Sequence, residues 1–385
     1  MNEPILLYRW GSSSDIELIK AFNKAGIFFL EFNEPMKDYH ADSDFSMKMI
    51  SFLEKNPVSA VISFDYFPLI SMICQIRKIK YLSWIYDCPQ LTLESKTLGY
   101  DNNYIFNFDA LYTERLIKTG AKNCYHMPLG ALPKKVDFTN ITYEHELSFI
   151  GNLYTEDKNR IRKAIEDNLF SEYTKGFLEG IINTQKKLYG FNLVKNSLDD
   201  SIVDEVSLVC ELSLGDMYRQ DAYQLVADAM NMEVSARERL DVLGLLGRSY
   251  PLSLYTGSKY PDEFKKSMIK NLGMVDYSKV GDIYSKSKIN LNITSKSIES
   301  GVPLRVFDVL SAGGFLITNY QPEIAELFVD GEELVMYTSY EDLLDKAEYY
   351  LEHDKERVEI SHNGYKAIED RFDLSKQVVS LISLC

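Results

Sequence analysis

The stretch Ser300-Gly301-Val302-Pro303-Leu304-Arg305-Val306-Phe307-Asp308-Val309-Leu310-Ser311-Ala312-Gly313-Gly314-Phe315-Leu316-Ile317-Thr318-Asn319 carries the clearest local pattern in the chain. A Gly-Val-Pro turn precedes apolar residues at helical spacing, and a Gly-Gly pair follows them before an apolar run. Glycine after a helix predicts a left-handed cap, and the apolar run that follows predicts a buried strand. The stretch therefore predicts a turn, a helix and a strand in succession, which is how parallel sheets covered by helices are built.

The start of this predicted helix suits an anionic group. Free backbone N–H groups and the positive end of the helix dipole attract phosphate, and Gly301 leaves room for a ligand. Arg305 in the first turn can make a forked, charge-assisted contact to a diphosphate. Asp308 lies one turn further on and could accept hydrogen bonds from ribose hydroxyls. The alternative is an ordinary helix with an exposed arginine and a glycine cap.

The same alternation of strands and helices extends over most of the chain. Short runs rich in Ile, Val, Phe and Tyr alternate with segments whose apolar residues recur at helical spacing, such as Asp15–Ala25 and Asp262–Asn271. Strands are expected at Ile5–Tyr8, Ala60–Phe64, Tyr81–Tyr86, Ile105–Phe108, Asn123–Met127, Leu147–Ile150, Leu252–Tyr255, Ile289–Ile293, Phe315–Thr318 and Leu334–Tyr337. The pattern predicts an α/β protein of two facing Rossmann-like domains, with ligands beyond the carboxyl ends of the strands.

Two features divide the chain into domains. A polar connector lies at about residues 131–146, and residues 155–246 contain no proline and are almost wholly helical in pattern. We therefore predict an N-terminal domain over residues 1–135 and a C-terminal domain over residues 146–370 with a helical insertion at about 155–246. A last helix, 371–385, could pack back on the N-terminal domain.

Composition excludes several classes of protein. The 385 residues include 42 Lys and Arg against 57 Asp and Glu, a net charge of −15. An excess of acid disfavours broad binding to nucleic-acid phosphates and a polybasic membrane patch. A local basic pocket for one anionic ligand remains compatible with this charge.

Other features point to a metal-free protein of the cytoplasm. The N-terminus lacks a cationic region and a long apolar run, so no signal peptide is expected, and no segment is apolar enough to span a membrane. The five cysteines are scattered without a Cys-x-x-Cys pair, which predicts neither a zinc site nor disulfides. Asp42-Ser43-Asp44 and Asp199-Asp200 each precede a predicted helix and are interpreted as helix starts rather than metal ligands.

Three candidate catalytic residues end predicted strands. Asp87 closes an apolar strand before Cys88-Pro89, and a partly buried carboxylate there, with a raised pKa, could deprotonate a hydroxyl. Asp65 closes the preceding strand and is the rival base. His126 also ends a strand and could act as a base or contact phosphate. Each could instead be a structural residue of its turn.

Further candidates lie in loops that follow strands. In Arg9-Trp10-Gly11-Ser12-Ser13, one serine could cap the next helix while Arg9, Gly11 and Ser12 face a ligand. Candidates for contact with a donor follow other strands: Gly151, Asn152, Thr256 and Glu299. Plain turns are the alternative at each place.

Residues 300–319 resemble the donor-binding helix of GT-B glycosyltransferases, whose usual form is Glu-Gly-Phe-Gly-Leu-Pro-x-x-Glu-Ala-x-Ala-x-Gly. More closely, this chain resembles the spore-maturation, CgeB-like branch of that fold. The blocks that carry this likeness are Ser83–Pro89, Phe106–Asp109, His126–Leu129, Ser148–Tyr154, Ser300–Asn319, Glu323–Phe328, Gly331–Leu334 and Tyr349–Leu351. The general pattern has glutamates where this chain has Ser300 and Asp308, which leaves the stereochemical outcome open.

The resemblance implies a glycosyltransferase that moves a sugar from a nucleotide-diphosphate sugar to an acceptor hydroxyl. It implies that Gly151 and Asn152 lie near the donor phosphates, that the loop around Gly11 lies near the donor phosphate or the acceptor, and that Asp308 binds ribose. No cofactor is expected, because the nucleotide sugar, in the first place a UDP-sugar, is a substrate. The acceptor could be a glycan, a surface polysaccharide precursor or a protein, with peripheral membrane contact open. Two alternatives remain, a sugar-nucleotide epimerase of the same fold and a non-catalytic nucleotide-sugar-binding or assembly module.

Overall fold

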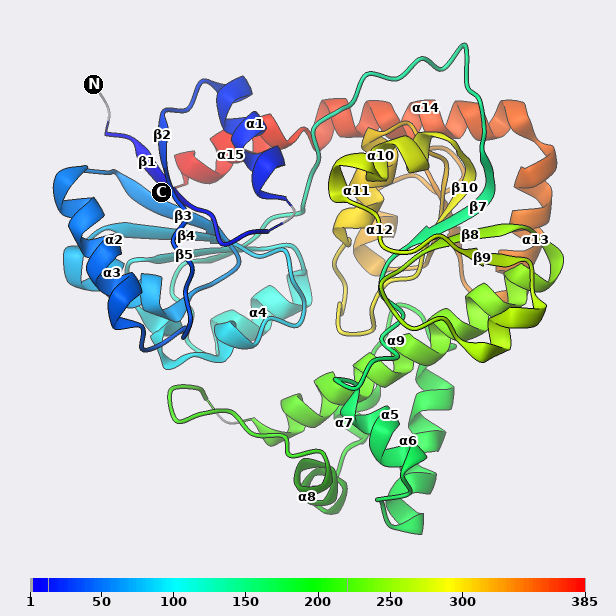
Figure 1. Ribbon diagram of the computed structural model, residues 1–385, viewed down its shortest axis with the longest axis horizontal. Helices are drawn as coiled ribbons and strands as arrows, with labels where there is room; N and C mark the ends of the chain where they lie inside the picture. Colours follow the sequence, from blue (N-terminus) through cyan, green and yellow to red (C-terminus); the bar gives the residue numbers. More distant parts are fainter. Residues whose placement is uncertain (1–2, 13, 220, 385) are drawn as a thin grey trace. The chain divides into compact units, whose positions relative to one another are not determined.

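The computed structural model describes residues 3–12, 14–219 and 221–384, which form two compact units. Unit 1 contains the chain up to Leu132, a short segment that starts at Leu214, and the end of the chain from Phe372. Unit 2 contains Pro133–Ser213 and Asp221–Arg371. Each unit has its own parallel sheet covered by helices (Figure 1).

Unit 1 is built on a parallel sheet in the order β2-β1-β3-β4-β5-β6. The strands are β1 (Ile5–Tyr8), β2 (Phe29–Phe32), β3 (Ala60–Phe64), β4 (Lys80–Trp84), β5 (Asn103–Asn107) and β6 (Cys124–His126). After β2 the chain crosses to the other side of β1, so the order reverses between β1 and β3. In such sheets, this reversal opens a crevice at the carboxyl ends of the two strands.

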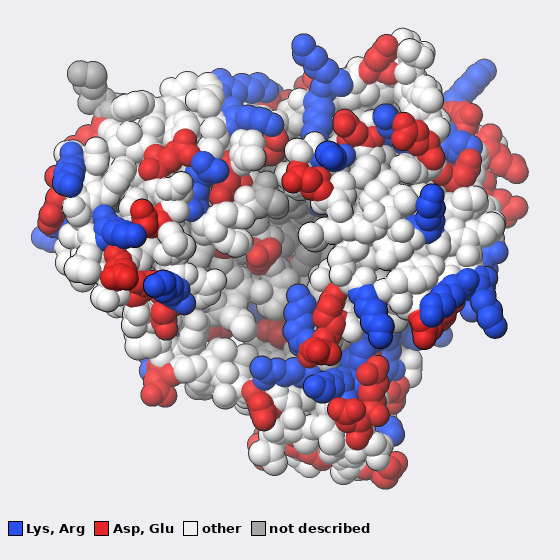
Figure 2. All heavy atoms as spheres, viewed as in Figure 1, with Lys and Arg blue, Asp and Glu red and all other residues white. Residues whose placement is uncertain are grey.

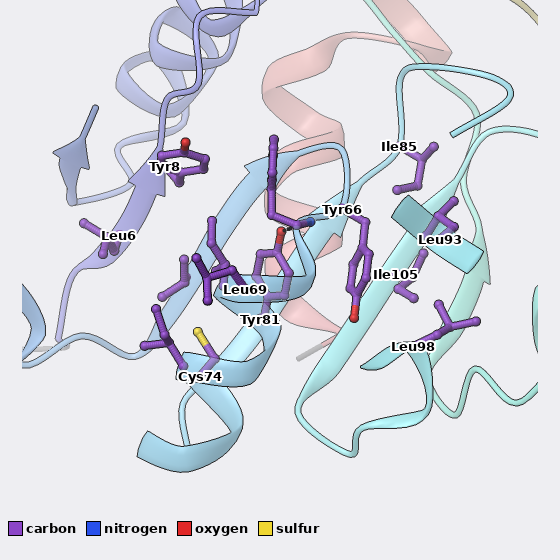
Figure 3. Packing of buried hydrophobic residues seen from close by; sticks show 14 of the residues in the cluster. Leu6, Tyr8, Tyr66, Leu69, Cys74, Tyr81, Ile85, Leu93, Leu98 and Ile105 are labelled. Carbon is purple, nitrogen blue, oxygen red and sulfur yellow. Dashed lines mark hydrogen bonds between the residues drawn. The ribbon is translucent and has the colours of Figure 1, made fainter. Parts of the chain in front are cut away.

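Helices cover both faces of this sheet: α1 (Asp15–Ala25), α2 (Ser43–Lys55), α3 (Pro68–Arg77), α4 (Ala110–Lys118) and α15 (Leu374–Ser383). Two 3₁₀ turns, η1 (Leu91–Glu94) and η2 (Lys96–Gly99), lie between β4 and β5. The helix α15, near the end of the chain, packs against α1 (Figure 1). Figure 3 shows the other face, where Tyr8, Tyr81 and Ile105 of the sheet pack against α3 and both 3₁₀ turns.

Unit 2 repeats this plan in the order β12-β11-β10-β7-β8-β9. The strands are β7 (His145–Ile150), β8 (Leu252–Tyr255), β9 (Ile269–Asn271), β10 (Ser287–Asn292), β11 (Leu316–Asn319) and β12 (Val335–Tyr337). Here the order reverses between β7 and β10. Around the sheet lie η3 (Asp262–Lys266), α10 (Tyr277–Ser285), α11 (Leu304–Ser311), α12 (Pro322–Leu327), α13 (Tyr340–Glu352) and α14 (Asp354–Arg371).

Between β7 and β8 the chain forms a group of helices: α5 (Arg160–Glu166), α6 (Glu172–Gln185), α7 (Val194–Ser197), α8 (Asp200–Val209) and α9 (Ala222–Ser249). The long helix α9 contacts the other four and continues to β8 and β9 (Figure 1). It therefore belongs to two cores. Val226, Met230 and Val234 pack among the helices, whereas Val242 and Leu246 pack under the sheet.

Most predicted elements are present, but one prediction is wrong and two strands were not predicted. Asp262–Asn271, predicted as a helix, is the 3₁₀ turn η3 followed by the strand β9. Pairing with β8 overrides the helical spacing, since Ile269 pairs with Leu252 and is buried. The other missed strand is β2, which has only four residues.

Helix ends follow the predicted chemistry with one correction. The side chains of Asp42 and Asp199 cap α2 and α8 by accepting backbone N–H bonds, as expected of helix starts. Gly313 has φ +70° after α11, which confirms the predicted left-handed turn. The cap of α1 is Ser14, not Ser12, and Ser13 lies outside the described residues. No helix in the described part of the chain is long and apolar enough to cross a bilayer.

Candidate active site

The predicted donor-binding residues gather in unit 2 where the strand order reverses, at the carboxyl ends of β7 and β10. Arg305 of α11 donates from Nη1 to Oδ1 of Asn292, the last residue of β10, at 2.8 Å. Its guanidinium lies 5.2 Å from the centre of the Phe149 ring in β7. The carboxyl ends of neighbouring strands thus fix a cation at the place where open α/β sheets bind ligands.

A second arginine, which the sequence did not single out, lies beside the first. Arg239 extends from the middle of α9, is buried, and donates to the backbone carbonyls of Asn152 and Ile293 at 2.5 and 2.9 Å. It lies over the same Phe149 ring at 5.5 Å. Burial lowers the pKa of Arg239, and Arg305 lowers it further by charge repulsion. Two guanidinium groups this close together would be stabilised by an anion between them.

Tyr154 completes this cationic cluster. Its ring lies 4.5 Å from the Arg239 guanidinium, and its pKa is lowered chiefly by Arg239, against the effect of burial. The residue has φ +58°, a conformation that costs a non-glycine residue energy. Its backbone N–H donates to Oδ1 of Asn152, which holds the turn. We call Arg239, Arg305 and Tyr154 the di-arginine site.

Gly151 and Asn152, predicted to touch a donor, shape this site. A Cβ atom at position 151 would lie 2.6 Å from Nη2 of Arg305, so glycine leaves the space that the arginine occupies. Thr256, also a predicted donor contact, accepts a hydrogen bond from the N–H of Ser258 at 3.1 Å. The Ser258 hydroxyl lies 3.2 Å from Oδ1 of Asn152, so this loop supports the Asn152 turn.

The helix α11 begins as predicted after the Gly301-Val302-Pro303 turn, and no side chain caps its N-terminus. Asp308 accepts a hydrogen bond from the Tyr277 hydroxyl at 2.9 Å and stays half-buried. Ser300 is buried and donates to Oε1 of Glu323 at 2.6 Å, so an acidic group lies directly beside the position where the GT-B pattern has its first glutamate. Glu299 is half-buried in the loop before this helix.

In unit 1 the structure brings the two predicted rival bases together. The Asp65 carboxylate accepts backbone N–H bonds from Tyr86 at 3.0 Å and Asp87 at 3.1 Å. Asp65 itself has φ +60°, and its carbonyl accepts from the hydroxyls of Ser63 and Ser83 at 2.7 and 2.8 Å. The ends of β3 and β4 therefore hold a carboxyl pair, Asp65 and Asp87, at the carboxyl edge of the sheet.

Both members of this pair bind protons more tightly than ordinary aspartates. Burial, and after it the charge of the neighbouring Asp87, raise the pKa of Asp65 to about 7. Asp87 keeps contact with solvent, but partial burial raises its pKa as well. A carboxyl pair that titrates near neutral pH is suited to accept a proton from a hydroxyl.

The other predicted residues of unit 1 have separate places. Arg9 pairs with Glu31 at 2.6 Å. Gly11 has φ +97° and donates its N–H to Asp15 at 3.2 Å, and the Ser12 hydroxyl accepts from the N–H of Ser14. His126 ends β6, two strands away from β4, which is about 10 Å at the usual strand spacing. The structure thus does not bring His126 to the carboxyl pair.

In the described parts of the chain, no group of three or more His, Cys, Asp and Glu side chains is placed to hold a metal ion. On the face drawn in Figure 2, acidic and basic side chains are interspersed over both units. The cationic di-arginine site is therefore a local feature of unit 2.

Each of the two units has a parallel sheet with polar residues at the point where the strand order reverses. This arrangement is that of the GT-B fold. Residues 233–383 match the family model described as glycosyl transferase-like. No curated protein matches the chain.

Three solved structures cover nearly the whole chain at low sequence identity. Sucrose-phosphate synthase from Thermosynechococcus elongatus has a TM-score of 0.56 and 10% identity, with 100% of this chain and 99% of that one covered. Anabaena HepE, in complex with UDP and glucose, has a TM-score of 0.53 and 11% identity, covering 99% and 100%. T4 phage beta-glucosyltransferase has a TM-score of 0.52 and 9% identity, covering 99% and 98%.

These likenesses confirm the predicted α/β fold of the GT-B type, with one Rossmann-like domain in each unit. The family match over residues 233–383 agrees with the predicted glycosyltransferase. The solved structures, at 9–11% identity, show the fold alone. The CgeB-like branch and the roles of the predicted site residues stay predictions.

Proposed function

We propose that this chain is a glycosyltransferase whose unit 2 binds a nucleotide-diphosphate sugar, in the first place a UDP-sugar. The observation that carries the proposal is the di-arginine site. It combines two guanidinium groups, the uncapped N-terminus of α11 and a strained turn at the strand reversal of a parallel sheet. This set of donors matches a diphosphate, whose negative charge grows as the bond to the sugar breaks.

Asp308 and Glu299 complete the proposed donor site. Asp308 lies one turn after Arg305 on α11, where its second carboxylate oxygen can accept from a ribose hydroxyl while the first holds Tyr277. Glu299 precedes the turn that opens the helix and is assigned to the sugar or the ribose. We also propose that the chain is a member of the CgeB-like branch, on the likeness of the blocks around Asp87, Gly151 and Arg305.

In unit 1 the proposed base is the carboxyl pair. Asp87 keeps contact with solvent and can reach an acceptor hydroxyl, whereas Asp65 is buried and holds the backbone of Tyr86 and Asp87. The hydroxyl oxygen attacks the anomeric carbon, its proton passes to the pair, and the nucleoside diphosphate leaves with the bonding electrons. The diphosphate charge is then neutralised by Arg305, Arg239 and the start of α11, without a metal ion.

A binding experiment tests the donor site. UDP and a panel of UDP- and other nucleotide sugars are screened by thermal shift, because a ligand of the folded state raises the melting temperature. The best ligand is then titrated by calorimetry into the wild type, Arg305→Ala and the control Arg248→Ala. Arg248 is exposed at the far end of α9.

Arg305→Ala should weaken binding more than tenfold, and Arg248→Ala should stay within twofold of the wild type. Equal affinity of Arg305→Ala and wild type would remove Arg305 from the phosphate site. Product analysis with a radiolabelled donor separates transfer from epimerisation and from mere binding, since only transfer moves the label to a second molecule.

A further inference from the structure

Two exposed aromatic rings of unit 1 contact the segment around Asp65, at the end of β3. Trp10 follows β1, with 39% of the residue exposed, and Tyr39 in the loop before α2 has 44% exposed. Both rings contact Phe67, which is buried and lies two residues after Asp65. The centres are 6.0 Å apart for Trp10 and Phe67, and 5.6 Å for Tyr39 and Phe67.

One hydrogen bond holds the ring of Trp10, and another holds the backbone of Tyr39. The Trp10 indole Nε1 donates to the carbonyl of Phe64, the residue directly before Asp65, at 3.1 Å. The carbonyl of Tyr39 accepts from the N–H of Leu69, in the first turn of α3, at 2.8 Å. Trp10 therefore lies at the strand reversal between β1 and β3, where open α/β sheets bind ligands. A ring that is fixed in place, as that of Trp10 is, binds a partner without losing much conformational freedom.

The charge around these rings is negative. The cations Arg9 and Lys48 are matched by Glu31 and Glu34, at 2.6 Å in each pair. That leaves Asp38 and Asp42, which are close to Tyr39 in the sequence, against Lys37. Backbone N–H bonds lower the pKa of both Asp38 and Asp42, so these two carry full charge at neutral pH.

From this arrangement we infer that Trp10 and Tyr39 form the acceptor subsite of the proposed glycosyltransferase, and that the acceptor is a carbohydrate without phosphate or carboxylate groups near the accepting hydroxyl. The inference rests on the proposed function and names its acceptor class. The apolar C–H face of a sugar ring packs on an aromatic ring, which favours a saccharide. Fixed carboxylates repel an anionic acceptor such as DNA or a phosphorylated polymer, but accept a neutral or an amino sugar.

Tryptophan fluorescence tests this subsite without any need for turnover. The chain has two tryptophans, and Trp84 is fully buried, so ligands and quenchers report mainly on Trp10. Caesium should quench Trp10 more efficiently than iodide, after each is normalised to free N-acetyltryptophanamide. The reverse order would show that the surroundings of Trp10 are not negative and would overturn the inference.

Ligand titrations follow in the same assay. Maltotriose and glucosamine trimer should change the fluorescence, and Tyr39→Ala should weaken that binding at least fivefold. The control is Phe28→Ala, which removes an aromatic residue with 68% exposure. Phe28 lies just before β2, at the amino-terminal end of the strands, whereas Trp10 lies at their carboxyl end. It should stay within twofold of the wild type. Trigalacturonate and a 12-base-pair DNA duplex should bind at least tenfold more weakly than the better trimer.

Besides the reverse quenching order, three results of the titrations would overturn the inference: no response to either trimer, an unchanged dissociation constant in Tyr39→Ala, or tighter binding of the anionic probes. The thermal-shift assay with nucleotide sugars, run on the same protein, distinguishes a failure of this inference from a failure of the proposed function. If nucleotide sugars raise the melting temperature but the trimers leave the fluorescence unchanged, only the acceptor subsite is wrong. If the trimers change the fluorescence but no nucleotide sugar raises the melting temperature, the donor site is wrong and the saccharide subsite stands.

Discussion

Arg305 occupies the space in unit 2 that a side chain on residue 151 would need, and residue 151 is a glycine. A Cβ atom on residue 151 would lie 2.6 Å from Nη2 of Arg305 and 3.3 Å from the ring of Phe149. The arginine can hold its position over Phe149 and against Asn292 only because residue 151 has no side chain. The glycine after β7 therefore serves the placement of a cation, in addition to the turn itself.

We expect Gly151→Ala to displace Arg305 and to weaken nucleotide binding about tenfold, because a contact below 3 Å must be relieved by movement of the guanidinium. The stability cost should be on the order of 1 kcal/mol, since the far end of a flexible side chain yields most easily. Calorimetric titration with UDP and urea denaturation measure the two effects.

The matched control is Gly176→Ala in α6, where an added Cβ meets nothing within 4 Å. It should leave binding unchanged and raise the free energy of unfolding by up to about 1 kcal/mol, because alanine favours a helix over glycine. If Gly151→Ala binds UDP as tightly as Gly176→Ala, the crowding at Arg305 has no role in donor binding.

Asp87→Asn should lower transfer at least 100-fold while donor affinity stays within twofold, because the base is lost and the di-arginine site is intact. In the wild type, transfer should rise with pH through about 7, since burial holds the proton on Asp65 to that pH and the pair must release it to act as a base. Steady-state kinetics from pH 5 to 9 measures this profile.

Asp101→Asn is the control for this experiment, because Asp101 is exposed and pairs only with Lys122 among the ion pairs of the described residues. It should keep the activity and the pH profile of the wild type. If Asp87→Asn keeps the full turnover rate, Asp87 is not the base, and Asp65 or another group has that role.

Asp65 also makes stability depend on pH. Its pKa of about 7 in the folded protein exceeds the ordinary value near 4, so the folded state keeps a proton that the unfolded chain loses between these pH values. The stability from this group is therefore complete below about pH 4 and is lost as pH rises through 7. Asp65→Asn keeps an oxygen that can accept from Tyr86 and Asp87, but it has no charge to bury.

We expect the free energy of unfolding of the wild type, relative to Asp65→Asn, to fall by on the order of 2 kcal/mol between pH 5 and pH 8. Urea denaturation at both pH values gives the difference. A wild type that gains stability relative to the variant over this range would mean that Asp65 is ionised in the folded protein.

The order of strands and helices could be predicted because the buried strands are short apolar runs and the helices carry regular spacing. Ile5–Tyr8, Ala60–Phe64 and Leu252–Tyr255 have the predicted bounds. The exceptions are the edge strands β2 and β9. The strand β2 lies in an apolar run, residues 27–32, that was not predicted, whereas the identity of β9 comes from pairing and not from its own residues. Lys270 and Asn271 of β9 are exposed, so no alternation or apolar run distinguishes them in the sequence.

The site was only partly predictable for a related reason. Arg305, Gly151 and Asp87 follow or precede strands, where the sheet rule points to ligands. Arg239 and Glu238 lie in the middle of a 28-residue helix among other charged residues, which in sequence resembles a solvated face. Arg239 is enclosed by Phe149 of β7 and by the segments that follow β7 and β10, and Glu238 lies against Lys296. No local pattern in the sequence encodes that packing.

A metal chelator gives a separate prediction. If the arginines and the start of α11 neutralise the leaving diphosphate, 5 mM EDTA should change the transfer rate less than twofold. Activity assays before and after dialysis against EDTA, with and without added Mg²⁺ or Mn²⁺, measure this. A rate that collapses and returns with metal would contradict neutralisation by the protein alone.

The buried ion pair between Lys296 and Glu238 lies next to Arg239 and provides the last prediction. Nζ of Lys296 lies 3.2 Å from Oε2 of Glu238, and neither residue has appreciable contact with solvent. Neither Glu238 oxygen receives a hydrogen bond of good geometry from the described residues, and the charge of Lys296 compensates this carboxylate more than Tyr189 and Arg239 do. Lys296→Met should therefore cost about 3–5 kcal/mol, because it removes the main partner of a buried carboxylate.

The double variant Lys296→Met, Glu238→Gln should recover most of this loss, since both charges are then gone. The loss in Lys296→Met should also be smaller at pH 5 than at pH 8, because burial raises the pKa of Glu238 and the carboxyl can take up a proton at low pH. Lys288→Met is the control, since Lys288 pairs with the partly exposed Glu146 and should cost less than about 1 kcal/mol. Equal losses in Lys296→Met and Lys288→Met would show that Glu238 does not rely on Lys296.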